Sequence, residues 1–237
     1  PYPWEAQEHE VNAHVAGVTA ELSRRGHRVI VIAPSRSPER VRESRRLLRS
    51  ARSQPGALLD GADAGEPNVI AVGEVLEVAP GNRRRPPALP IDVARTVEEL
   101  LGTLELDFVH VHEPFAPSTS AAALRHSRAL NVGSFHAATE RLLATLLARR
   151  FLETSFARLD ARTASSAAAA ELMARYFPAE YRLVPPRDAR TAADGYEAIY
   201  RELAARRHNG AVPALAERLT GRSLIDVDLH MHTDHSY

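Results

Sequence analysis

The sequence predicts an α/β fold built on a doubly wound parallel sheet. Short apolar, β-branched runs alternate with segments whose apolar residues recur at helical spacing, as in repeated β-α-β units. The chain of 237 residues is 44% hydrophobic, which is enough to bury the core of one large α/β domain. In such sheets ligands bind at the carboxyl ends of the strands, so the residues that follow each strand are the first candidates for a site.

Composition excludes several kinds of chemistry. All 30 basic residues are arginine, so there is no Schiff-base lysine and no phosphate-loop lysine, and the absence of cysteine excludes thiolate and disulfide chemistry. The 30 acidic residues balance the arginines, so no global field attracts nucleic acid. No apolar run reaches the length of a membrane span and no signal peptide is visible, which fits a cytoplasmic protein.

The first quarter of the chain predicts a helix, a strand and an arginine-rich segment. Residues 8–25 carry apolar side chains at helical spacing, and Gly26 stands where a helix cap belongs. Residues 29–32 are a β-branched run before Pro34, which predicts a buried strand. Residues 36–55 are rich in arginine and serine, which is typical of a solvated helix or a mobile loop; a phosphate-binding patch is the alternative.

The rest of the chain continues the alternation as far as residue 184, where the pattern breaks and one helix follows. Strands are predicted at residues 69–72, 74–78, 108–111, 131–135, 161–164 and 181–184. Helices are predicted at residues 91–104, 117–128, 138–149, 166–176 and 192–207, and a proline-rich loop at 81–90. A linker at 208–213, a short helix to residue 219 and an alternating strand at 224–229 follow.

Polar residues follow several of these strands and are therefore candidates for a ligand site. They are Ser35, His112, Glu113, His136 and Ser165. For His110, the alternation of a strand places its side chain on the opposite face from Val109 and Val111, so we expect it to pack within the layer.

Four segments together resemble a known family. They are PYPW (1–4) with VNAHV (11–15) and LSRRGHRV (22–29), then FVHVHEPFAPS (108–118), SFHAAT (134–139) and LVPPRD (183–188). Their order and spacing resemble the N-terminal, acceptor-side half of a GT-B glycosyltransferase of family 4, and are similar to the phosphatidylinositol mannosyltransferases.

This resemblance implies a Rossmann-like domain with a C-terminal returning helix, and a function in nucleotide-sugar-dependent hexosyl transfer. It implies a catalytic role for His136, which would orient the donor sugar or stabilise charge near the anomeric centre. The alternative for His136 is a packed or solvent-facing loop histidine. Tyr2, His14, His112 and Glu113 would bind substrate. The implied partners are a nucleotide-sugar or glycosyl acceptor and a peripheral membrane contact, with no cofactor for this domain.

Two departures from the family pattern change the expected function. The opening loop of the family carries a Gly-Gly pair that admits donor phosphates, whereas residues 5–10 read EAQEHE, which lacks glycine and carries three carboxylates. The helix predicted at 192–207 also follows Asp188 almost directly, where the family has a second, donor-binding domain. We therefore expect a binding or regulatory module, with an active transferase as the alternative. We also expect a further strand before Pro1, because the strands at 29–32 and 108–111 would otherwise flank a gap.

The end of the chain carries a separate motif. Asp228-Leu-His-Met-His-Thr233 resembles the first motif of PHP-type metal phosphoesterases, and strand alternation puts His230 and His232 on one face. The resemblance implies a divalent metal, zinc or manganese, if a PHP domain is complete; a His-rich tail is the alternative. The sequence thus divides into 1–188, the glycosyltransferase-like domain, 189–220, the returning helix and linker, and 221–237, the start of a PHP domain. The alternative function is an accessory region of a PHP phosphoesterase.

Overall fold

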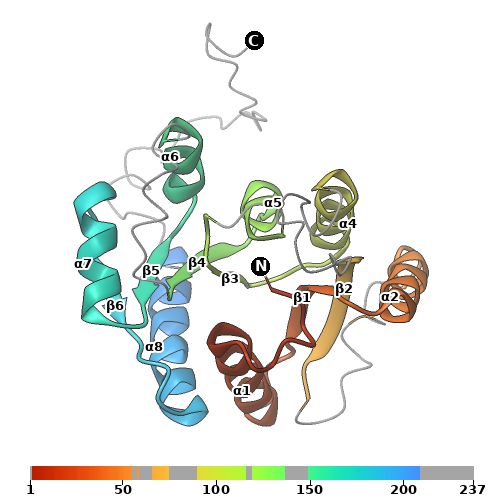
Figure 1. The fold of residues 1–237 in the computed structure, drawn as a ribbon, viewed down its shortest axis with the longest axis horizontal. Coiled ribbons are helices and arrows are strands. Elements are labelled where there is room, and N and C mark those ends of the chain that lie inside the picture. The colour runs from red at the N-terminus through yellow and green to blue at the C-terminus, as the bar shows by residue number, and fades with distance from the viewer. Residues whose placement is uncertain are drawn as a thin grey trace, which may run out of the picture. The chain divides into compact units, whose positions relative to one another are not determined.

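The computed structural model describes residues 2–54, 58, 66–74, 90–115, 119–136 and 149–208. Helices and strands alternate along them (Figure 1). In chain order they are α1 (Glu10–Arg24), β1 (Ile30–Ser35), α2 (Pro38–Ala51), β2 (Asn68–Glu74), α4 (Pro90–Thr103), β3 (Phe108–His112), α5 (Thr119–His126), β4 (Leu130–Phe135), α6 (Arg149–Ala157), β5 (Ala161–Ala164), α7 (Ala167–Tyr176), β6 (Arg182–Leu183) and α8 (Ala189–His208).

The strands pair in parallel, which confirms the predicted fold class. β1 pairs with β2, and β3, β4, β5 and β6 form a second sheet in that order. Among the described residues no strand pairing joins the two sheets, so β1 and β3 each lie at a sheet edge. In the larger sheet His112 is the register partner of Ser134, so β3 and β4 end side by side.

The arginine-rich segment predicted at 36–55 is largely helical. Ser37 caps α2 by accepting a hydrogen bond from the Arg40 amide, and a proline stands in the first turn, where its missing N–H costs nothing. Helical spacing then turns Val41, Leu48 and Ala51 into the core, while arginines occupy the exposed face. The phosphate-binding alternative for this segment stays a prediction.

The sequence patterns missed one helix, α6, and several predicted elements cannot be compared. α6 begins at Arg149, near the end of the helix predicted at 138–149, and continues to Ala157, where no helix was predicted. The predicted helix at 138–149 falls almost wholly outside the described residues, as do most of the strand at 74–78, most of the loop at 81–90 and every element after 208.

Helix α8 belongs to the core of the domain. Tyr196, Ile199 and Leu203 of α8 are buried in one apolar cluster with Val18 of α1 and Val132 of β4. The compact unit that holds the sheets extends through Leu203. None of the helices in the described part of the chain has the length and apolar character needed to cross a bilayer.

Ion pairs join α8 to the end of α1. The Arg25 guanidinium donates to Asp194 at 2.7 Å and lies 3.4 Å from Glu197, and the ring of His27 contacts Glu197 at 2.9 Å. The side chains of Asp194 and His27 are 64% and 50% exposed, so solvent screens most of this ionic contact and the apolar cluster holds α8 on α1.

Gly133 in β4 gives the first testable prediction. A Cβ at this position would lie 2.8 Å from Leu159 and 2.9 Å from Pro114, both too close for carbon atoms. Gly133→Ala should therefore lower the free energy of unfolding by about 1–3 kcal/mol, measured by urea denaturation. Gly102→Ala is the matched control, because its Cβ would meet no atom within 4 Å, and it should be neutral or stabilising by up to about 1 kcal/mol. Equal stabilities of the two variants would contradict the close packing at Gly133.

Candidate functional site

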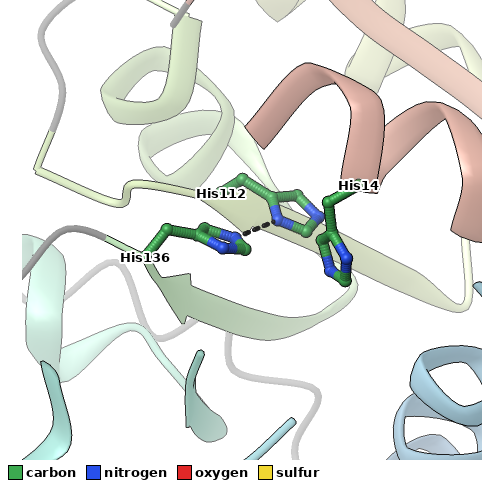
Figure 2. Close-up of side chains that lie close together, drawn as sticks. All are labelled: His14, His112 and His136. Carbon is green, nitrogen blue, oxygen red and sulfur yellow. Dashed lines mark hydrogen bonds between the residues drawn. The ribbon is translucent and has the colours of Figure 1, made fainter. Parts of the chain in front are cut away.

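Three histidines gather at the carboxyl ends of β3 and β4. His112 is the last residue of β3, and His136 directly follows β4. His14 reaches the same place from α1, where helical spacing turns it inward together with Val11 and Val18. Figure 2 shows the three rings grouped beside the two strand ends. The strand-end rule thus located two members of the cluster, and the family resemblance located the third.

The rings are close enough to act on one ligand. Nδ1 of His112 lies 2.8 Å from Nε2 of His136, a hydrogen bond in which one ring donates and the other accepts (Figure 2). The ring centroid of His14 lies 5.2 Å from that of His136 and 5.9 Å from that of His112. One nitrogen of each ring falls within 4.8 Å of the others.

A layer of polar side chains supports the cluster on the sheet. His110, on the same face of β3 as His112, stacks on it with 4.6 Å between ring centroids. Its Nδ1 shares a hydrogen bond with the Tyr200 hydroxyl at 2.6 Å, and its Nε2 with Ser134 Oγ at 2.7 Å. The Ser134 hydroxyl in turn shares a hydrogen bond with the Thr163 hydroxyl at 2.6 Å. His110 therefore packs within the layer, as strand alternation predicted, and holds His112 in place.

Sequence reasoning missed the contribution of α8. The Tyr196 hydroxyl lies 2.9 Å from Nε2 of His14 and accepts a bond from the Ser134 hydroxyl at 3.3 Å. Tyr196 is 1% exposed, so both contacts are buried. Tyr196 and Tyr200 stand four residues apart, so the sequence could have predicted that they share one helix face. Nothing in that spacing indicates that the histidines are their partners.

Glu113 and Tyr2 lie beside the cluster. Glu113 has a φ of 54°, a left-handed conformation that is uncommon for a residue with a side chain. Its amide donates to the Ser134 carbonyl at 2.8 Å, and its carboxylate accepts from the His136 amide at 2.9 Å. The ring of Tyr2 stacks on that of His9 with 3.6 Å between their centroids. Burial is the main cause that raises the pKa of Tyr2, and the negative charge of Glu113 is the second.

The histidines are held neutral. Burial is the largest cause in each case. It lowers the pKa of His14, lowers the pKa of His112 well below its usual value, and lowers the pKa of His136 to about 4. Burial, followed by His136 and His14, lowers the pKa of His110 to about 3. A neutral imidazole keeps one lone pair and one N–H, so the cluster can accept from a hydroxyl, donate to one, or ligate a metal.

The remaining candidates stand as follows. The Ser165 hydroxyl donates to the His136 carbonyl at 3.1 Å, so it helps to place that residue. Ser35 is engaged by Glu5 instead. His230 and His232 lie outside the described residues, so the PHP metal site stays a prediction from the sequence. The catalytic role of His136 and the substrate-binding roles of Tyr2, His14, His112 and Glu113 also stay predictions.

A pocket of about 590 Å³ lies away from the histidines. It is lined by α1, α2 and the ends of β1 and β2, with Glu5, Ser35, Arg40 and Ser44 among its polar residues. None of the three clustered histidines lines it. We place the candidate site at the histidine cluster because its groups converge there, whereas Glu5 in the pocket is already engaged by Ser35 and lies 3.9 Å from Arg40.

Comparisons with known proteins identify the family. The model of Glycosyltransferase Family 4 matches residues 11–186. A phosphatidyl-myo-inositol mannosyltransferase from Propionibacterium freudenreichii subsp. shermanii is 31% identical over 166 residues, which cover 70% of this chain and 39% of that protein. The chain thus spans about two fifths of the length of this relative. The match includes β1 to β6 and all three clustered histidines, and the chain belongs to glycosyltransferase family 4.

Proposed function

We propose that this domain is a glycosyl-binding module that descends from the acceptor-side half of a nucleotide-sugar-dependent hexosyltransferase. The observation that carries the proposal is the direct passage from β6 to α8, with only residues 184–188 between them. In the transferases that the chain resembles, the donor domain follows the segment that corresponds to residues 183–188. Here the next helix packs on the sheet, and its Tyr196 binds His14. A donor domain therefore has no place at this point in the chain.

The N-terminal loop supports the same proposal. The carboxylate of Glu5 accepts hydrogen bonds from Ser35 Oγ at 2.5 Å and from the Arg36 amide at 2.9 Å. Although partial burial raises the pKa of Glu5, these hydrogen bonds outweigh it and lower the pKa overall, so the group stays ionised at neutral pH. A carboxylate that occupies the donors at the end of β1 repels a diphosphate from them.

The histidine cluster suits a polyol or sugar. Because Nδ1 of His112 and Nε2 of His136 share a hydrogen bond, the two remaining ring nitrogens offer a ligand one donor and one acceptor. The Glu113 carboxylate adds an acceptor beside them. The name of the mannosyltransferase relative points to two ligand classes, a myo-inositol headgroup and a mannosyl group. We propose both as ligand classes of this chain. If the inositol headgroup belongs to a lipid, its binding would bring the domain to a membrane surface.

Ligand binding by the full chain tests this proposal. Calorimetry with millimolar GDP-mannose or UDP-glucose should show no detectable heat, because no donor domain stands between β6 and α8 and residues 5–10 carry no glycine pair. Saturation-transfer NMR with myo-inositol 1-phosphate or methyl α-mannoside should show binding with a Kd of about 1 mM. His136→Ala should reduce that signal at least fivefold, whereas His126→Ala, at the end of α5, should preserve it.

Two results would contradict the proposal in different ways. A micromolar isotherm for GDP-mannose would show that the chain binds donor and would favour the active transferase. No NMR signal for any sugar or polyol, from a protein folded by circular dichroism, would overturn the binding role.

A further inference from the structure

The geometry of the histidine cluster points to a metal ion. His14, His112 and His136 come from α1, from the end of β3 and from the residue after β4, yet one ring nitrogen of each lies within 4.8 Å of the other two (Figure 2). Three imidazoles with no thiolate and no carboxylate among them are a ligand set that suits zinc, cobalt, nickel or copper. Magnesium and calcium prefer oxygen ligands.

A tetrahedral ion would need the three rings to shift toward a common centre. Zinc holds imidazole nitrogens at about 2.0–2.1 Å, which leaves them about 3.3 Å apart in a tetrahedron. Nδ1 of His112 and Nε2 of His136 already face each other at 2.8 Å, so they would need to separate by about half an ångström. The nitrogen of His14 lies within 4.8 Å of the other two, so that ring would need to approach them by up to about 1.5 Å. The ion would replace the single proton that these two nitrogens share.

The surroundings hold the rings as a metal site requires. The Tyr196 hydroxyl contacts His14 Nε2 at 2.9 Å, a second contact of the kind that orients a ligand histidine. The stacked ring of His110 supports His112. The main chain of His136 is held by Glu113 and by Ser165, and the Glu113 carboxylate also places a negative charge near the ion.

We propose that His14, His112 and His136 form a binding site for a divalent transition metal, zinc foremost, with the fourth coordination position open to water or to an oxygen of a bound ligand. Three protein ligands and one open position are the composition of zinc sites that act on a ligand rather than only on the fold. None of its three ligands is one of the sequence-predicted metal ligands at 230 and 232, and the inference does not depend on the proposed sugar binding.

Cobalt titration tests the site directly. The full chain, free of affinity-tag histidines, is used in a background that carries His230→Ala, His232→Ala and His235→Ala, so that the tail cannot compete. Because the chain has no cysteine, visible cobalt bands report nitrogen and oxygen ligands alone. Binding with a Kd below about 10 µM is expected, with zinc displacing cobalt.

Variants in the same background assign the ligands. His136→Ala and His14→Ala should each weaken cobalt binding at least 100-fold, Tyr196→Phe about tenfold, and His126→Ala should leave it unchanged. X-ray absorption at the zinc edge of the background protein should show three imidazoles, and this measurement needs no folded variant. Failure to bind cobalt or zinc at 1 mM, unchanged affinity in folded His136→Ala, or fewer than three imidazoles at the zinc edge would each overturn the proposal.

Discussion

Tyr196→Ala is expected to lower the free energy of unfolding by about 3–5 kcal/mol, the usual cost of removing a large buried aromatic side chain. The ring is 1% exposed and packs in one cluster with Val18, Val132 and Val184, which belong to α1, to β4 and to the residue after β6. Its loss would leave a cavity where α8 meets the sheet. It would also leave Nε2 of His14 without its hydroxyl partner.

Matched variants separate packing from hydrogen bonding at Tyr196. Tyr196→Phe keeps the ring and removes only the hydroxyl, so it should cost about 1–3 kcal/mol. Leu183→Ala, at a leucine that is 53% exposed, should change stability by less than about 0.5 kcal/mol. Urea denaturation followed by circular dichroism measures all three. If Tyr196→Ala costs less than about 1 kcal/mol, α8 does not belong to the cooperative core, and the direct passage from β6 to α8 loses its meaning for function.

The order of elements could be predicted from sequence because the periodicity of apolar residues is local. The run at 29–32 and the repeat at 91–104 each carry their own signal, and both became elements close to the predicted bounds, β1 and α4. α6 was missed because its apolar repeat, Leu152 and Phe156 in RRFLETSFA, spans only one turn and follows directly on the helix predicted at 138–149. Such a helix forms through tertiary packing, as the burial of Leu152 indicates.

Part of the site could be predicted from the sequence. His112, Glu113 and His136 could be named from the rule that polar residues at strand ends meet at one edge, and the register of β3 and β4 bears this out. The contacts of Tyr196 and Thr163 could not be named, because they depend on how α8 and β5 pack around Ser134. No local pattern carries the relative placement of elements that lie more than 60 residues apart in sequence, as Ser134 and Tyr196 do.

Acidification should destabilise the domain before its carboxylates titrate. In the unfolded chain a histidine has a pKa of about 6.5, whereas in the folded domain His136 has a pKa of about 4 and His110 of about 3. Below pH 6.5 the unfolded state therefore binds protons that the folded state does not, and stability falls as the pH falls. Above pH 6.5 both states are neutral at these rings, so the effect vanishes.

The magnitude follows from the same linkage. Each fully shifted histidine contributes at most about 1.4 kcal/mol per pH unit, and His14 and His112, whose pKa values are also lowered, add to the effect. With a chelator present, we expect at least about 2 kcal/mol to be lost between pH 6.5 and 5, measured by urea denaturation at fixed ionic strength. The carboxylates whose pKa is lowered, such as those of Glu5 and Glu197, contribute only below about pH 4.5.

His110→Asn is the informative variant for this pH dependence. An asparagine can keep a polar contact with Ser134 or Tyr200 but does not titrate, so the variant should show a flatter slope between pH 6.5 and 5 even if it is less stable at pH 7. His126→Asn removes a histidine outside the cluster and should keep the slope of the parent protein. A slope that is the same in the parent, His110→Asn and His126→Asn would mean that the buried rings do not control acid unfolding. If the stability of the parent protein does not change between pH 6.5 and 5, the cluster accepts protons in the folded state. The conclusion that the histidines are held neutral would then be wrong.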